Sequence, residues 1–148
     1  MNTIIINDNN LLDSAVHKNG NKARAVLLKD DKILVSHYGG IILLPGGSID
    51  SGETPDDAII RELREEIGIS YDINELRKFM ILKYYQPSYQ TRDNELINRM
   101  ITTHYYLGDY RGIDLYKVKR TEKEKKDNFY LELLPFDKLM QLLNTSSD

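Results

Sequence analysis

Residues 54–67 form the strongest helical pattern in the chain and restrict the fold more than any other segment. Thr54 is placed to cap this helix, Pro55 suits its first turn, and Gly68 suits its end. At about 100° per residue, the apolar positions fall on one face. They are Ile59, Ile60, Leu63 and Ile67. We expect this face to be buried against a sheet.

The other periodic segments predict the sheet. Residues 23–28 and 33–37 are expected to form a hairpin, and further strands are predicted at 41–44, 79–85, 99–107 and 131–134. Residues 136–143 predict a second helix. The polar segments 86–98, which contains Pro87, and 117–126 predict loops. The fold class is therefore α/β (α+β), a mixed sheet flanked by helices, and 148 residues suit a single domain.

The predicted helix gathers three carboxylates within one turn. Glu62, Glu65 and Glu66 stand at positions i, i+3 and i+4, at the edge of the apolar stripe. Carboxylates at the rim of a buried face are placed to line a crevice, and Mg²⁺ prefers such oxygen ligands. The alternative is an ordinary solvated helix face, because like charges at this spacing destabilise a helix by only a few tenths of a kcal/mol.

Composition excludes several other functions. The chain has no cysteine, so disulfides, thiolate metal sites and cysteine nucleophiles are ruled out. A net charge of −3 argues against a nucleic-acid partner. No apolar run approaches the roughly 20 residues of a membrane helix. The first residues lack the basic and apolar regions of a signal peptide. We expect a cytoplasmic protein that does not bind a membrane.

A longer motif includes the carboxylates. It runs Gly47, five residues, Glu53, seven residues, and then Arg61-Glu62-Leu63-Arg64-Glu65-Glu66-Ile67-Gly68-Ile69. This segment resembles the Nudix box, G-x5-E-x7-R-E-U-x-E-E-x-G-U, where U is aliphatic, and every defined position matches. The resemblance implies the Nudix fold, with a mixed sheet sandwiched between helices. The complete motif also favours a metal-binding helix over an ordinary solvated one.

The resemblance implies roles for the box residues. Glu62, Glu65 and Glu66 would be ligands of Mg²⁺, with Mn²⁺ as the alternative, and the backbone carbonyl of Gly46 resembles a further ligand. Arg61 would orient a box glutamate. Glu53 would assist metal binding or anchor the helix. From its position just before the helix, Glu53 can either reach the same carboxylate cluster or accept a hydrogen bond from Arg61.

Family members differ in their general base, which is a box glutamate in some and a carboxylate outside the box in others. Glu122 and Glu124 are the candidates outside the box, and each has the alternative of being a plain loop charge.

The reaction implied is attack of water on phosphorus in a nucleoside diphosphate linked to another group. The substrate would be a nucleoside triphosphate, a dinucleoside polyphosphate or a similar small nucleotide. Two alternatives remain, a catalytically silent nucleotide sensor of the same fold and a pyrophosphohydrolase of RNA 5′ ends. Homodimers are common in the family, and the sequence leaves that state open.

Residues outside the box give weaker indications of substrate binding. Arg24 and His37 are placed to reach phosphate from the predicted hairpin, or are surface residues. Tyr84 and Tyr85 are candidates for stacking on a base, although neighbouring strand residues point to opposite faces. Tyr84 stands where ADP-ribose subfamilies tend to carry a proline, 15 residues beyond the box. Tyr85 falls where dinucleoside polyphosphate subfamilies tend to carry a tyrosine.

Overall fold

The computed structural model describes residues 1–126 and 128–146. Its strands are β1 (Asn2–Ile6), β2 (Lys18–Lys29), β3 (Lys32–Tyr38), β4 (Ile41–Leu43), β5 (Gly46–Ser48), β6 (Arg77–Gln90), β7 (Leu96–Asp109) and β8 (Tyr130–Pro135). Its helices are α1 (Pro55–Ile67), α2 (Glu122–Lys126) and α3 (Phe136–Ser146), with 3-10 turns at Asp13–Ala15 and Ile73–Glu75. No helix in this described part is long and apolar enough to cross a membrane.

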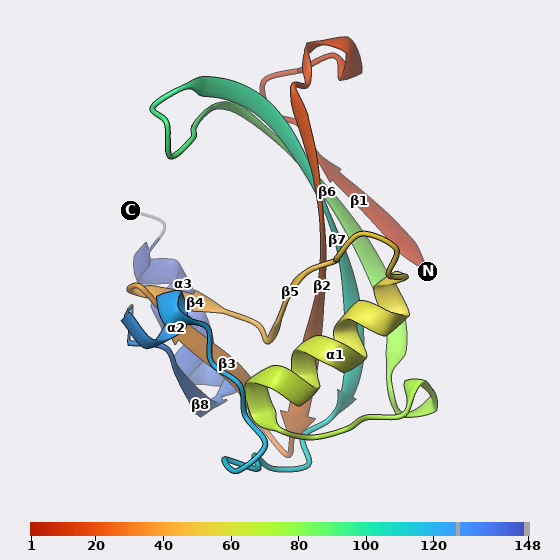
Figure 1. The fold of residues 1–148 in the computed structure, drawn as a ribbon, viewed down its shortest axis with the longest axis vertical. Coiled ribbons are helices and arrows are strands. Elements are labelled where there is room, and N and C mark those ends of the chain that lie inside the picture. Colours follow the sequence, from red (N-terminus) through yellow and green to blue (C-terminus); the bar gives the residue numbers. More distant parts are fainter. Residues whose placement is uncertain (127, 147–148) are drawn as a thin grey trace.

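The strands form one mixed sheet in the order β1-β6-β7-β2-β3-β4 (Figure 1). β5 pairs with β2, and β8 pairs with β3. The pairs β1–β6 and β2–β7 are parallel, and the others are antiparallel. This arrangement confirms the predicted α+β class, including the hairpin of β2 and β3.

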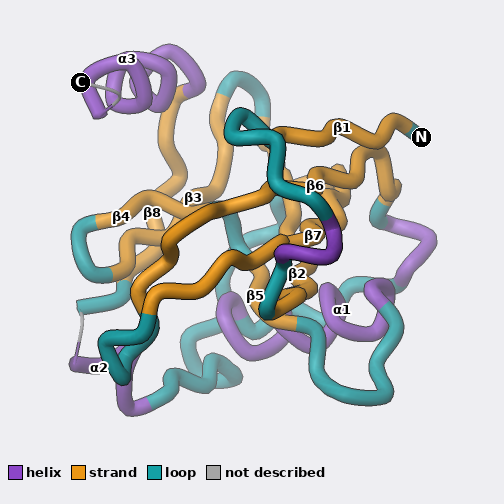
Figure 2. Tube along the Cα trace, turned by 90° about the horizontal axis from the view of Figure 1, so that it is seen from above, coloured by secondary structure: helices purple, strands orange, loops and turns teal. Residues whose placement is uncertain are grey.

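Helices α1 and α3 cover opposite faces of the sheet (Figure 2). Successive residues of a strand point to opposite faces. In β3, Leu34 packs in the core cluster that contains α1 residues, whereas Ile33 and Val35 pack in a second cluster with Leu139 of α3. The sandwich therefore follows from an apolar run in β3 that is buried on both sides.

Helix α1 begins and ends where the sequence predicts. The Thr54 hydroxyl accepts a hydrogen bond from the Asp57 amide at 3.1 Å, and the Asp57 carboxylate accepts one from the Thr54 amide at 3.2 Å. Gly68 ends the helix in the left-handed region, at φ 75°. Of the predicted apolar face, Ile59, Leu63 and Ile67 are fully buried, which confirms its direction.

The loop predicted at 86–98 is confirmed only for residues 91–95, because β6 continues to Gln90 and β7 starts at Leu96. The register shifts between Gln86 and Tyr89, where Pro87 and Ser88 oppose a single β7 residue. Such a bulge tolerates proline, since the bulged residues leave the regular hydrogen-bond ladder. The loop predicted at 117–126 also ends in a short helix, α2.

Strands β2 and β3 separate soon after their turn. Only Leu28–Ile33 and Lys29–Lys32 pair between them. Strand β5 pairs with β2 at Lys22–Arg24, whereas β3 pairs with β4 and β8. The sheet is therefore opened beside β5, directly next to helix α1 (Figure 1).

Candidate active site

The carboxylates of α1 face strand β5 at close range. A Cβ atom on Gly47 would stand only 2.6 Å from Oε1 of Glu62, so any larger residue here would have to displace the end of the Glu62 side chain. Gly46 has φ 139° and lies against the backbone of Ala23 and Arg24 in β2. The glycines of the motif thus bring the chain between the sheet and the acidic edge of the helix.

Arg61 connects these carboxylates to one another. Its Nε and Nη2 donate to both oxygens of Glu53, at 2.6 and 2.9 Å. Its Nη1 donates to Glu62 at 3.1 Å and to Glu65 at 3.3 Å, and Nη2 also donates to the Ser48 carbonyl at 3.0 Å. The hydrogen bond with Arg61 lowers the pKa of Glu53, and the same bond raises the pKa of Arg61. Glu53 therefore anchors Arg61, one of the two arrangements that the sequence left open.

Glu66 is the most buried carboxylate of the set, with 6% of its surface exposed. Its Oε2 accepts a hydrogen bond from the Gly46 amide at 2.8 Å. Burial raises the pKa of Glu66 to about 8, and the Gly46 amide opposes that shift. Burial also raises the pKa of Glu62, against the effect of Arg61. A cation in this pocket would favour the charged forms of both groups.

Two adjoining cavities lie beside these residues. The first, of about 400 Å³, is lined mainly by α1, β5 and the segment before α2, and includes Glu62, Glu65 and Glu66. The second, of about 340 Å³, adds the basic residues Lys22 and Arg24. The cavities share Tyr38, Gly46, Gly47, Ser48, Glu66 and Glu124. The carboxylates of the first cavity thus adjoin basic residues of the second, which also include Lys123.

The segment before α2 is fixed to the end of α1. The Lys119 amide donates to the Glu65 carbonyl at 2.8 Å, and the Arg120 guanidinium donates to the Glu66 carbonyl at 2.8 Å. This attachment places Glu124 on the wall of both cavities. The Glu122 side chain is 94% exposed, pairs with Lys125 and lines neither cavity. The structure therefore separates two candidates that the sequence could not.

The donor chemistry of the first cavity suits a hard divalent cation, since the three α1 carboxylates offer oxygen ligands at one wall. In the described residues, however, no three acidic or histidine side chains converge as a ready metal site. Arg61 Nη1 donates to both Glu62 and Glu65. A cation bound here would share these two carboxylates with the guanidinium.

The other residues suggested by the sequence lie at different places. Arg24 lines the second cavity, and its Nη1 donates to the Leu44 carbonyl at 2.7 Å. His37 pairs with Glu132 at 2.9 Å, stacks on Tyr130 and lines neither cavity.

The two tyrosines of β6 are also separate from the carboxylates. Tyr84 is 43% exposed, and the Tyr85 hydroxyl donates to Asp13 at 2.6 Å. Neither lines a cavity next to the carboxylates. Of the substrate and general-base candidates outside the box, Arg24 lines the second cavity and Glu124 lines both.

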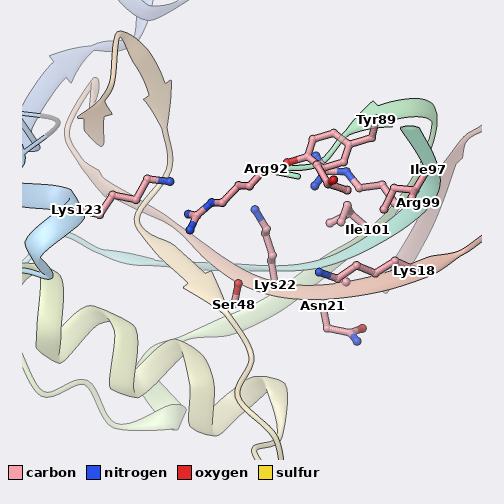
Figure 3. A pocket seen from close by; sticks show the side chains of 12 residues that line it. Lys18, Asn21, Lys22, Ser48, Tyr89, Arg92, Ile97, Arg99, Ile101 and Lys123 are labelled. Atoms are coloured by element: carbon pink, nitrogen blue, oxygen red, sulfur yellow. The ribbon is translucent and has the colours of Figure 1, made fainter. Parts of the chain in front are cut away.

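Sequence reasoning missed a third, basic cavity of about 570 Å³ (Figure 3). Its basic lining residues are Lys18, Lys22, Arg92, Arg99 and Lys123. A signal was present in the alternation of Lys18, Gly20 and Lys22. The sequence pattern predicts a strand only from residue 23, and Arg92 comes from the distant turn between β6 and β7.

Comparisons with known proteins agree with this arrangement. The family model described as NUDIX domain matches residues 14–146. The 8-oxo-dGTP diphosphatase of Proteus vulgaris is 56% identical over 36 residues, which are 24% of this chain and 32% of that protein. The ADP-ribose pyrophosphatase of Methanocaldococcus jannaschii is 39% identical over 49 residues, 30% of this chain and 29% of that protein. These matches span about a third or less of the relatives' length.

A solved structure extends the likeness to the fold. The MutT NUDIX hydrolase of Burkholderia pseudomallei superposes with a TM-score of 0.55 at 20% identity, over 81% of this chain and 85% of that one. At this identity the likeness concerns the fold alone. The family match covers most of the chain, and the chain belongs to the NUDIX domain family.

Proposed function

We propose that this protein is a divalent-cation-dependent hydrolase that cleaves a pyrophosphate bond in a nucleoside diphosphate linked to another group. The observation that carries this proposal is the pair of joined cavities, with Glu62, Glu65 and Glu66 at one wall and Lys22 and Arg24 at the other. Such a reaction requires carboxylates that hold a cation, and basic groups that contact the phosphate oxygens.

In this proposal the three α1 carboxylates and the Gly46 carbonyl hold Mg²⁺, or Mn²⁺ in its place. When bound, the cation neutralises phosphate charge and lowers the pKa of the attacking water. Arg61 is a positioning residue, because it touches Glu62 and Glu65 while Glu53 fixes it from the other side. These contacts restrict the rotation of the Glu62 and Glu65 side chains in advance, so less conformational entropy is lost when the cation and substrate bind.

Glu124 is the proposed proton acceptor. The oxygen of the attacking water forms a bond to phosphorus, the bridging oxygen leaves with the electron pair of the broken P–O bond, and the water proton passes to the Glu124 carboxylate. Glu124 fits this role because it lines both cavities from outside the helix that would hold the cation.

The relatives supply the first substrates to test. 8-oxo-dGTP and ADP-ribose come from their names, and a dinucleoside polyphosphate and a nucleotide sugar complete the panel. With Mg²⁺ present, we expect a nucleoside monophosphate and the complementary phosphate product from at least one substrate, measured by anion-exchange chromatography. Glu65→Gln should remove this turnover, whereas Glu95→Gln, at an exposed position outside the two cavities beside the carboxylates, should retain it.

Binding of nucleotide without turnover would instead favour the sensor function. Full activity of Glu65→Gln would contradict the proposed role of the helix carboxylates.

The role of Glu124 has a matched control on the same short helix. We expect Glu124→Gln to lower kcat by about 100-fold, the lower range for loss of a general base. Glu122→Gln removes the same charge from an exposed position and should leave kcat unchanged. The pH profile of kcat distinguishes this role from a structural one, since the acidic limb should disappear only in Glu124→Gln. Equal activity of the two variants would place the base on α1.

A further inference from the structure

The basic cavity lies between β2, β7, the turn that joins β6 to β7, and α2 (Figure 3). In this view the side chains of Lys22, Arg92 and Lys123 point toward one another from three separate elements. None of the residues that line the cavity is acidic.

The positive charge of this cavity is largely unbalanced. Within residues 1–126 and 128–146, no ion pair forms to Lys18, Lys22, Arg92 or Lys123. Arg99 has partners, but they are neutral, because it lies over the Tyr89 ring at 3.4 Å and donates to Gln86 at 2.8 Å. Converging like charges repel one another in a partly buried site, and a bound anion relieves that repulsion.

The strand geometry builds this site in a regular way. Lys18, Gly20 and Lys22 alternate along β2 and line the cavity together, and Arg24 follows at the next alternate position. Gly20 between the two lysines leaves room for Ile101, since a Cβ there would lie 2.7 Å from the end of the Ile101 side chain. The basic row therefore continues along one face of β2 from the basic cavity to the second cavity of the candidate active site.

The two cavities are also continuous in their lining. Lys22, Ser48 and Lys123 border both of them. Ser48 further borders the carboxylate cavity. A ligand with several linked anionic groups can thus contact Arg24 at one end and Arg92 at the other.

We propose that the basic cavity binds phosphate groups that the substrate carries beyond the pyrophosphate bond that is cut. The preferred substrates are small nucleotides with an extended phosphate chain, such as dinucleoside polyphosphates, rather than nucleotides whose second phosphate carries only a neutral sugar. This inference rests on the proposed function for the adjacent carboxylate site, but the binding of phosphate itself does not.

Inorganic tripolyphosphate tests the anion site without catalysis. Titration calorimetry with the full chain, in the presence of a chelator, should show binding that weakens as salt is added. Arg92→Gln should weaken it by about fivefold and Arg92→Gln with Lys123→Gln by more, in the range for partly exposed charge contacts. Arg77→Gln is the matched control, because Arg77 is exposed, lies outside the cavity and carries the same charge.

A second measurement assigns the site to the substrate. The ratio of kcat/KM for a dinucleoside polyphosphate to that for ADP-ribose should fall in Arg92→Gln and stay constant in Arg77→Gln. No tripolyphosphate binding, or equal binding by all variants, overturns the inference. So does tighter binding of 5′-triphosphorylated RNA whose affinity grows with RNA length, which would assign the cavity to nucleic acid. If binding follows the expected order but no substrate is cleaved, the proposed function fails and the anion site stands.

Discussion

At the scale of single residues, Arg61 combines contacts that no other residue type can reproduce. Its planar guanidinium bonds both oxygens of Glu53 and still reaches Glu62 and Glu65. Lysine keeps the charge but cannot form this fork. We expect Arg61→Lys to lower the free energy of unfolding by about 1–3 kcal/mol, typical for loss of hydrogen bonds to charged groups, and to lower kcat.

The control for this substitution is Arg64→Lys, an exposed position on the same helix. It should change the free energy of unfolding by less than about 0.5 kcal/mol. Urea unfolding and steady-state kinetics measure both effects. Equal stability and activity of the two variants would show that the Arg61 network has no structural or positioning role.

Glu66 predicts a pH dependence of stability in the metal-free protein. Burial raises its pKa from the ordinary 4.5 to about 8. The folded protein therefore keeps a proton here that the unfolded chain releases above pH 4.5. The protonated Glu66 therefore contributes fully to the free energy of unfolding below that pH. This contribution falls as pH rises toward 8, by up to a few kcal/mol in all.

Glu66→Gln isolates this effect, because glutamine does not titrate and still offers an oxygen to the Gly46 amide. The free energy of unfolding, measured in urea with a chelator present, should fall more steeply with pH in the wild type than in the variant. Parallel pH profiles would mean that Glu66 is ionised in the folded protein near its ordinary pKa.

At the scale of elements, the pairing of β5 with β2 depends on Gly46. This residue has φ 139°, and an added Cβ would lie against the Ala23 carbonyl and 2.7 Å from Cα of Arg24. Both contacts are with backbone, which cannot turn aside as a side chain can. We expect Gly46→Ala to lower the free energy of unfolding by about 2–4 kcal/mol, within the range for strained core substitutions.

Gly52 supplies the comparison for Gly46. It also has a positive φ, 84°, but an added Cβ would meet no atom within 4 Å. Gly52→Ala should therefore show only the cost of the left-handed backbone, about 1–2 kcal/mol. Chemical denaturation of both variants measures the difference. If the two costs are equal, the close packing of β5 on β2 does not contribute to stability.

At the scale of the whole molecule, sequence predicted the parts that local chemistry determines. The capping residues and apolar face of α1 are local signals, as is the turn between β2 and β3. The pairing of Glu53 with Arg61 was also accessible, because both belong to one short segment. These features could be predicted because each depends on residues close in sequence.

What sequence did not predict depends on contacts between distant segments. Strand β1 pairs with the distant strand β6, from Asn2 with Met80 to Ile6 with Tyr84. The polar end of β6 is extended because β7 supplies a partner, despite Pro87 in the bulge. The basic cavity joins Lys18, Arg92 and Lys123, which no local pattern connects. Likewise, only the attachment of Lys119 to the end of α1 distinguishes Glu124 from Glu122.

A cation bound at the α1 carboxylates should stabilise the whole folded chain. A ligand that binds only the folded state stabilises it by mass action, by about 1.4 kcal/mol at ten times its Kd. For a protein of this size, that raises Tm by roughly 3–6 °C. We expect Mg²⁺ to raise Tm, a chelator to reverse the change, and KCl at equal ionic strength to have little effect. Glu62→Gln with Glu65→Gln should abolish the Mg²⁺ response, because two of the three proposed carboxylate ligands are then neutral. An undiminished response in this double variant, measured by differential scanning calorimetry, would locate the cation away from the α1 carboxylates.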